Sequence, residues 1–273
     1  MLGASRTSQR QLAERLEAVY DDPTQTDFLG EAGTGVLSVV SATDRERTLR
    51  TLWADTATPS QVKDGVLAQL FGERIPQLSR DIVTDVIHSR WSNPGDMSEG
   101  LEEAGESLLF MAAEKDGRLD QVEEELFRFG RSLDASPQLQ MALTDPATSH
   151  EVKTGIIQDL VVGKSDPITA ELLVYLAGHL RGRRMGTAVK QASALAAVRR
   201  NRIVAEVRSA TPLDDSQKER LSSALSGIHG RDVLVNVTVD PAVIGGIEVR
   251  IGDELIDGTL SNRIEQARRR LTS

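Results

Sequence analysis

The sequence predicts a mostly helical α+β protein, in which tandem helical bundles precede a small C-terminal domain with the element order β-α-β-β-α. Three observations support this prediction. Apolar residues recur at helical spacing through residues 1–202, the same region contains an internal repeat, and the spacing changes to strand-like alternation after residue 203. We therefore expect domains at residues 1–97, 98–202 and 203–273.

Apolar stripes at helical spacing run through the first two predicted domains. The clearest steps by three and four residues through Leu119, Val122, Leu126, Phe129 and Leu133. This spacing places the five side chains on one face of a helix. A second stripe covers residues 172–180, after Asp166 as a helix N-cap and Pro167 at the first helical position. These regions are therefore predicted to be amphipathic helices.

The internal repeat aligns residues 49–90 with residues 139–181, at a shift of 90 positions that becomes 91 after one inserted residue. Shared helical composition explains matched apolar residues but not matched glycine, lysine, proline and histidine. The sequence therefore predicts a duplicated helical bundle, with the breaker Asn93-Pro94-Gly95 as the candidate boundary. Examples of the matches are Val62 with Val152, Lys63 with Lys153, Gly65 with Gly155, Pro76 with Pro167, and His88 with His179.

The last predicted domain begins with a strand at residues 203–209. Asp214 and Gln217 then form a capping-box pattern that opens a helix. Alternating apolar residues predict strands at 233–239 and 247–251, and residues 255–256 could begin a partner strand after the turn. A final helix is predicted from the apolar stripe Leu260, Ile264, Ala267 and Leu271.

Composition excludes several classes of protein. The 273 residues include no cysteine, which rules out a disulfide framework, a thiolate nucleophile and a zinc ribbon. The histidines, at positions 88, 150, 179 and 229, lack metal-ligand spacing. The longest uncharged apolar stretch, residues 172–178, is far shorter than a membrane span, and no secretory signal is visible. We expect an acidic, soluble, intracellular protein with no metal and no cofactor.

Two motifs leave alternative functions open. Gly163-Lys164-Ser165 resembles the end of a phosphate-binding loop, but the glycine required five positions earlier is Gln158, so a glycine-capped helix end is favoured. Residues 181–202 carry seven bases and no acid, whereas residues 99–125 carry ten acids and two bases. The alternatives are therefore a nucleotide-binding helical protein or a basic-patch nucleic-acid adaptor. The net charge of −9 favours a simpler interpretation, in which the two charged helices face each other or a charged partner.

The C-terminal residues resemble a known family. The patterns SA-x-PL at 209–213, VDP-x-x-IGG at 239–246 and IGD-x-x-IDG at 251–258 occur in the order and spacing of the delta subunit of F-type ATP synthases. The mitochondrial counterpart of that subunit is the oligomycin-sensitivity-conferring protein. The resemblance spans roughly residues 101–273, and the extra N-terminal copy is similar to the long form of actinobacterial delta subunits. The motif residues with an implied structural role are Pro212, Asp240, Pro241, Gly245, Gly246, Gly252, Asp257 and Gly258.

The resemblance implies a non-catalytic stator subunit that couples proton flow to ATP synthesis. It implies one copy per complex at the cytoplasmic face of the plasma membrane, in contact with the membrane only through the complex and without nucleic acid. The implied partners are the alpha and beta subunits of the catalytic head and the b subunit of the peripheral stalk.

The resemblance also implies two contact sites. In the family, an alpha-subunit helix binds between the first and fifth helices of the helical domain, which here implies Leu108, Met111, Ala112, Leu172, Leu176 and His179. Which of the two copies provides this groove stays open. The implied b-subunit contact is the final helix, with Leu260, Ile264, Ala267, Leu271, Arg269 and Arg270.

Overall fold

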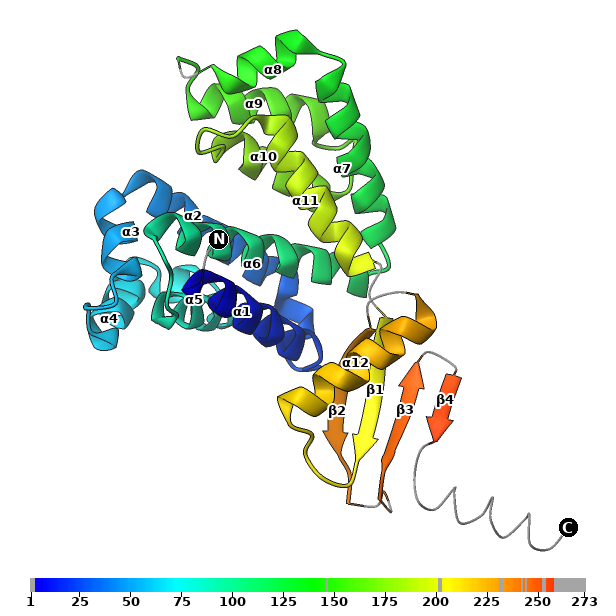
Figure 1. Cartoon of the computed structure of the whole chain (residues 1–273). Helices are drawn as coiled ribbons and strands as arrows, with labels where there is room; N and C mark the ends of the chain where they lie inside the picture. The colour runs from blue at the N-terminus through cyan, green and yellow to red at the C-terminus, as the bar shows by residue number, and fades with distance from the viewer. Residues whose placement is uncertain are drawn as a thin grey trace, which may run out of the picture. The chain divides into compact units, whose positions relative to one another are not determined.

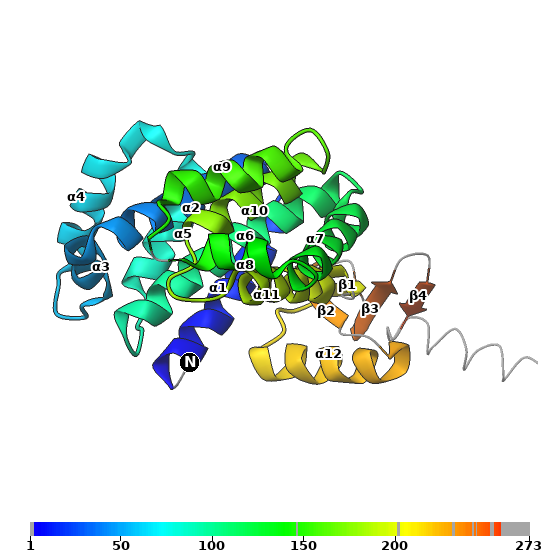
Figure 2. The same cartoon turned by 90° about the horizontal axis from the view of Figure 1, so that it is seen from above.

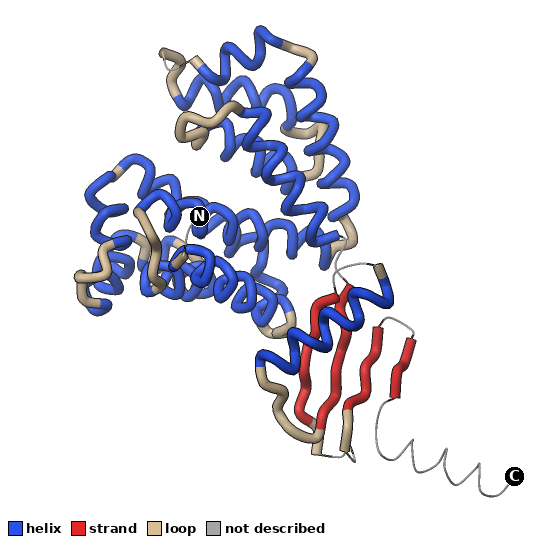
Figure 3. Tube along the Cα trace, viewed as in Figure 1, coloured by secondary structure: helices blue, strands red, loops and turns tan. Residues whose placement is uncertain are grey.

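The computed structural model describes residues 3–145, 147–200, 203–230, 233–241, 243, 245–251 and 254–257. The chain separates into two compact units, Met1–Arg200 and Asn201–Ser273, which we call the helical unit and the C-terminal unit. All described strands belong to the C-terminal unit (Figure 3). The mostly helical α+β class predicted from the sequence is confirmed.

The helical unit consists of helices joined by short connections (Figure 1), with 3₁₀ turns at Thr26–Phe28 and Gly72–Arg74. Helices predicted from apolar spacing are present, and Leu119, Val122, Leu126 and Leu133 are buried. The helices are α1 (Ala4–Tyr20), α2 (Leu29–Arg45), α3 (Arg47–Ala54), α4 (Ser60–Leu70), α5 (Gln77–His88), α6 (Pro94–Lys115), α7 (Leu119–Asp134), α8 (Pro137–Thr144), α9 (His150–Val161), α10 (Pro167–Gly178) and α11 (Met185–Arg200).

The internal repeat has a direct structural counterpart. Helices α3, α4 and α5 begin at residues 47, 60 and 77, and α8, α9 and α10 begin 90 positions later, at residues 137, 150 and 167. Side-chain caps open several of these helices. The Asp166 carboxylate, for example, accepts a hydrogen bond from the backbone N–H of Ile168 at 2.9 Å, as its position before Pro167 predicts.

Helix α6 belongs to both copies of the repeat. It packs against α1, α2 and α5 on one side and against α7, α10 and α11 on another. Leu101 and Leu108 lie in one apolar core, whereas Leu109 and Phe110 lie in the other. We call α1–α6 the first bundle and α6–α11 the second bundle. The division expected between residues 97 and 98 therefore falls inside a helix that the two bundles share.

Glycine allows α2 to approach α6 closely. A β-carbon placed on Gly33 would lie 2.9 Å from the carbonyl oxygen of Gly105, which is nearer than van der Waals contact permits. The two helices run beside each other in both views of the unit (Figures 1 and 2). This close crossing fixes α2 against the shared helix.

The C-terminal unit is a four-stranded mixed sheet with one described helix, α12 (Asp215–His229), packed on one face (Figure 2). Its strands are β1 (Ile203–Ser209), β2 (Val233–Val239), β3 (Ile247–Ile251) and β4 (Glu254–Asp257), in the order β2-β1-β3-β4. β1 pairs with β2 in parallel and with β3 antiparallel, and β4 is antiparallel to β3. The small core contains Ala205, Val207, Leu225, Val233 and Val249.

Local sequence signals of the C-terminal unit are confirmed in detail. Asp214 and Gln217 form both hydrogen bonds of a capping box, and α12 ends at Gly230 with φ 66°. The element order β-α-β-β-α omitted one strand, β4, which forms at the pair of residues where a partner strand was considered. A short strand of four residues gives too little alternation to be distinguished from a turn. The predicted final helix lies outside the described residues.

Candidate functional site

The phosphate-loop candidate forms the end of helix α9. Gly163 has φ 72°, the left-handed conformation that glycine adopts readily after a helix C-terminus. The Lys164 ammonium donates to the backbone carbonyl of Asp159 at 2.7 Å, and the Ser165 hydroxyl donates to that of Val161 at 3.0 Å. These donors satisfy carbonyls that the helix end leaves free, so the predicted glycine-capped helix end is confirmed.

The basic stretch near the end of the helical unit pairs with the acidic stretch of α6 and α7. The interpretation in which the two charged helices face each other is therefore confirmed, and much of the basic charge is neutralised within the chain. The ion pairs include Arg183–Glu102 at 3.0 Å, Arg199–Glu114 at 2.5 Å, Arg200–Asp120 at 2.7 Å and Arg200–Glu123 at 2.9 Å.

Arg199 of α11 joins the two bundles at one end of α6. Its guanidinium pairs with Glu114 of α6 and with Glu17 of α1, the latter at 3.1 Å. It also lies over the ring of Tyr20, 4.3 Å from the ring centre. Because the Arg199 side chain is 8% exposed, these contacts are shielded from solvent. We call Arg199, Glu17 and Glu114 the Arg199 clamp.

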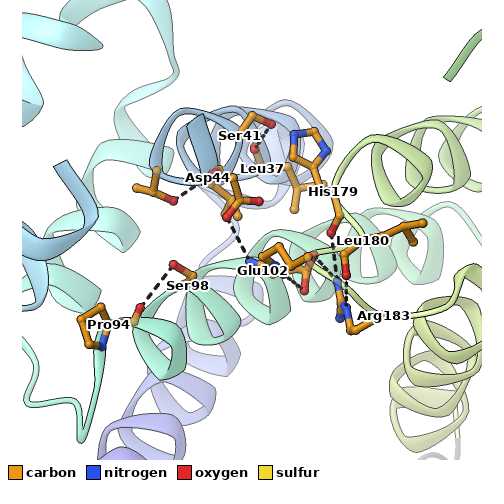
Figure 4. Close-up of polar contacts among 12 residues, drawn as sticks. Leu37, Ser41, Asp44, Pro94, Ser98, Glu102, His179, Leu180 and Arg183 are labelled. Atoms are coloured by element: carbon orange, nitrogen blue, oxygen red, sulfur yellow. Dashed lines mark hydrogen bonds and ion pairs between the residues drawn. The ribbon is translucent and has the colours of Figure 1, made fainter. Parts of the chain in front are cut away.

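Arg181 makes an equivalent junction nearer the start of α6. Its guanidinium pairs with Glu102 of α6 and lies 3.6 Å from the carboxylate of Asp44 on α2. Glu102 also accepts a hydrogen bond from Arg183, which itself donates to the carbonyls of His179 and Leu180 (Figure 4). We call Arg181, Asp44 and Glu102 the Arg181 clamp. In each clamp, an arginine of the second bundle pairs with one acid on α6. The same arginine also reaches one acid on another helix of the first bundle.

Titratable groups around the Arg181 clamp have shifted pKa values. Burial, reinforced by the charge of Glu102, raises the pKa of Glu106 from 4.5 to about 8. Burial and the same carboxylate raise the pKa of Tyr175 well above 10, and its hydroxyl donates to Glu102 at 3.4 Å. Burial lowers the pKa of His179, whose ring stacks on Tyr175 with 4.4 Å between centres. At neutral pH these three groups are therefore uncharged.

The residues expected to line an alpha-subunit groove on α6 and α10 lie within the chain's own core. Leu108 and Met111 pack in the core of the first bundle, whereas Leu172 and Leu176 pack in that of the second. All four are at most 1% exposed, and only Ala112 and His179 of the expected set are partly exposed. The assignment of these residues stays a prediction, but four of them present no surface to a partner in this structure.

Helices α1 and α5 hold the places in the first bundle that α6 and α10 hold in the second. They border an open cleft of about 240 Å³. It is lined by Gln11, Leu12, Arg15, Asp85 and Ser89. Arg15 donates to Asp85 across it at 3.0 Å. Leu12 gives the cleft an apolar base, and the polar side chains form its rim.

Among the C-terminal motif residues that the structure describes, Asp240 makes an ion pair within the sheet and the pair Gly245-Gly246 lies just before β3. Arg208 of β1 pairs with Asp240 after β2 and with Glu248 of β3, the latter at 3.2 Å. Gly245 and Gly246 have φ 66° and 81°, as expected for a glycine pair that allows left-handed backbone before β3. Pro212 and Pro241 are exposed, and Asp257 ends β4. Gly252 and Gly258 lie outside the described residues, as do all six expected b-subunit contacts, Leu260, Ile264, Ala267, Leu271, Arg269 and Arg270.

Comparison with known proteins identifies the family. Residues 107–271 match the family model described as ATP synthase delta (OSCP) subunit. The chain is 40% identical over 271 residues to ATP synthase subunit delta of Streptomyces griseus, with 99% of each chain covered. This chain belongs to the ATP synthase delta (OSCP) subunit family. It is also 39% identical over 282 residues to ATP synthase subunit delta of a Parafrankia species, with both chains fully covered.

One solved structure, of the Toxoplasma gondii mitochondrial ATP synthase hexamer, matches 62% of this chain and 95% of its own at 22% identity. Its TM-score of 0.29 is too low for a comparison of folds. The family model begins inside α6, so it covers most of the second bundle and the C-terminal unit. The full-length relatives extend the match through α1–α5, which confirms the resemblance to long actinobacterial delta subunits.

As a delta-family protein, the chain is a stator component of the F-type ATP synthase and a structural rather than a catalytic subunit. None of the helices in the described part of the chain has the length and apolar character needed to cross a bilayer. Across the same residues, no three histidine, aspartate or glutamate side chains gather in a way that could hold a metal ion.

Sequence reasoning missed how the delta-family duplication is joined. The charge blocks indicated that α6 and the basic helix attract each other, but not that Arg181 and Arg199 also reach acids of the first bundle. It also missed Lys63, which is 5% exposed and donates to the carbonyls of Trp53 at 2.6 Å and Ile87 at 2.8 Å. The repeat matched Lys63 with Lys153 but gave no signal for burial, because Lys153 is partly exposed.

Proposed function

We propose that this delta-family chain connects the alpha and beta subunits of the catalytic head to the b subunit of the peripheral stalk. One copy serves each complex, at the cytoplasmic face of the plasma membrane, and it reaches the membrane only through the complex. The supporting observation is the full-length similarity to delta subunits, which covers both compact units of the chain. A connecting subunit needs two separate binding surfaces, and two units provide them.

Reconstitution tests this connecting role. Membranes depleted of the chain should retain ATP hydrolysis by the detached head but lose ATP-driven proton pumping, and adding the chain back should restore pumping. Pumping that is unchanged without the chain would refute the proposal. Equilibrium dialysis with ATP is the accompanying control, because saturable micromolar binding would favour the nucleotide-binding alternative.

We place the alpha-subunit contact on the helical unit, and the structure favours the first bundle for it. The predicted positions on α6 and α10 are largely buried, whereas the cleft between α1 and α5 is open. An amphipathic helix that enters this cleft can lie over the small exposed part of Leu12, which is 6% exposed, and can pair polar groups with Arg15 and Asp85 at the rim. The alpha-subunit helix would then bind between the first and fifth helices, as predicted, but in the first bundle, where the cleft between α1 and α5 is open.

A blocking substitution tests this placement with a synthetic peptide that copies the alpha subunit's N-terminal helix. Gln11 is exposed at the cleft, so Gln11→Trp fills it without disturbing the core. We expect at least tenfold weaker peptide binding, about 1.4 kcal/mol, by fluorescence anisotropy. The matched control, Gln158→Trp on exposed α9, should bind as the wild type does. Equal binding by both variants would return the site to α6 and α10.

We assign the b-subunit contact to the C-terminal unit, with the apolar stripe and the arginines of the predicted final helix. Arg269 and Arg270 close that sequence, and cations there suit a partner with acidic residues. Replacing both by glutamate should weaken capture of b in a salt-dependent way while circular dichroism stays unchanged. Full capture at low salt would discard this assignment but not the connecting role.

A further inference from the structure

The first bundle contains a polar cavity that the connecting role does not use. It is open to solvent, has a volume of about 370 Å³ and lies where the turn before α4 meets the end of α5. Among the residues that the structure describes, its lining consists of hydroxyl and basic side chains and includes no carboxylate. The lining residues that matter here are Ser60, Lys63, His88, Ser89 and Arg90. Such a lining offers hydrogen-bond donors and positive charge, which suit an anion.

We propose that this cavity binds a phosphate group, either as free inorganic phosphate or as the phosphoryl end of a small molecule. A tetrahedral phosphate carries acceptor oxygens on several sides, so hydroxyls, backbone amides and cations can donate to it at the same time. The site belongs to the first bundle alone. It goes beyond the connecting role proposed above and does not depend on the identity of the partner subunits.

A buried lysine provides charge to the lining. Lys63 is 5% exposed, and its ammonium donates to the backbone carbonyls of Trp53 at 2.6 Å and Ile87 at 2.8 Å. An ammonium has three N–H donors, so these two carbonyls leave one donor for a ligand. Across the described part of the chain this ammonium makes no ion pair with a carboxylate. An anion in the cavity would therefore supply the counter-charge that a buried cation requires.

Helix α4 begins at the cavity without a side-chain cap. Its first residue, Ser60, lies in the lining, and the N-cap position is Pro59, whose side chain has no atom that can accept a hydrogen bond. The first backbone N–H groups of a helix have no partner within the helix, so those of Ser60 and Gln61 are available to a ligand. The helix dipole favours negative charge at the same end. Amide donors thus supplement the buried lysine.

The two copies of the repeat differ at this place. The counterpart of Pro59 is Ser149, which caps α9 by accepting from the backbone N–H of Val152 at 3.3 Å. The counterpart of Arg90 is Arg181, whose guanidinium belongs to the Arg181 clamp. Arg90, by contrast, is exposed and forms no ion pair within the described residues. The equivalent groups are therefore engaged inside the chain in the second bundle and available to a ligand in the first.

Two acids lie near the cavity, and both have partners of their own. Asp64 pairs with the ring of His88 at 2.7 Å. Asp55 accepts from the backbone N–H of Ala57 at 2.9 Å and from the Thr58 hydroxyl at 3.3 Å. Neither acid lines the cavity. Lys63 and Arg90 are therefore the charges that a phosphate group would meet.

Nuclear magnetic resonance of the isotope-labelled full chain tests the site. The probe is inorganic phosphate, with sodium chloride at equal ionic strength as the reference. We expect saturable shifts of the amides of Ser60, Gln61 and Arg90, and none at His150, the first residue of α9. Methyl phosphate distinguishes the two sources: equal affinity indicates a phosphoryl end, and weaker binding indicates free phosphate. Shifts at the start of α4 that are no larger than those in chloride, with either probe, would overturn the proposal.

Variants assign the binding to this cavity. Ser60→Asp places a carboxylate where the helix dipole favours it but where it repels an anion, so the protein should fold by circular dichroism and bind phosphate about tenfold more weakly or less. His150→Asp, the same change at the start of α9, is the matched control and should bind as the wild type does. Arg90→Gln should weaken binding about threefold, whereas Arg131→Gln, at an exposed arginine of the second bundle, should not. Wild-type affinity in a folded Ser60→Asp protein would contradict the site.

Discussion

The stability of the helical unit should fall as pH rises through the range set by Glu106. An acid whose pKa is higher in the folded than in the unfolded chain binds more protons when folded, so its contribution favours the folded state at low pH. For Glu106 this contribution is lost between the ordinary value of 4.5 and the folded value of about 8. Above pH 8 the loss is complete.

The magnitude follows from the same two values. A rise from 4.5 to about 8 spans about 3.5 pH units, and each unit corresponds to about 1.4 kcal/mol. The full effect is therefore about 5 kcal/mol, of which about 3.5 kcal/mol has been lost at pH 7. Such a change is a large part of the 5–15 kcal/mol that typically stabilises a folded domain.

Comparison of Glu106→Gln with the wild type separates the contribution of Glu106 to the free energy of unfolding from the contributions of the other titrating groups. We expect the variant to match the wild type within about 1 kcal/mol at pH 5 and to exceed it by about 3–5 kcal/mol at pH 8.5. Urea unfolding is followed by tryptophan fluorescence, because both tryptophans, Trp53 and Trp91, lie buried in the helical unit. A stability difference between variant and wild type that stays constant from pH 5 to 8.5 would refute the reasoning.

Two further changes are checked by the same unfolding assay. Lys63→Met should cost about 1–3 kcal/mol, because it strips a buried ammonium from the carbonyls that end α3 and α5, whereas Lys153→Met at the part-exposed repeat position should stay within about 0.5 kcal/mol. Equal losses at the two lysines would contradict a capping role for Lys63. Gly33→Ala should cost about 1–3 kcal/mol by forcing α2 from α6, whereas Gly65→Ala, with open space around it on α4, should gain up to about 1 kcal/mol. A neutral Gly33→Ala protein would show that the crossing can relax.

The sequence allowed the helices and strands to be predicted because burial on one face leaves a periodic pattern. The stripe from Leu119 to Leu133 is buried as its spacing requires, and the alternating residues around Val249 form strands. The groove was harder to predict, because a leucine that lines an open groove and one that packs in a core have the same spacing. Leu172 and Leu176 satisfy either pattern, and only the packing of neighbouring helices distinguishes them.

The charge pattern gave a similar partial result. Opposite blocks at 99–125 and 181–202 predicted that the helices carrying them attract each other, since attraction depends on net charge alone. Individual pairs depend on where long arginine side chains can reach. Arg199 therefore contacts α1 as well as α6, and its partner Glu17 lies far outside the acidic block. Sequence position carries no signal for such a contact.

The shared helix explains why the duplicated region behaves as one unit. An α-helix that is apolar on one stripe needs one packing partner, but α6 buries Leu101 and Leu108 in one core and Leu109 and Phe110 in the other. Dividing the chain near residue 98 would leave the first pair without α1, α2 and α5, and the first bundle without its sixth helix. Each fragment would then expose apolar surface that the other covers in the intact chain. Beside α6, the ion pair of Arg181 with Asp44 links the second bundle to α2, and that of Arg199 with Glu17 links it to α1.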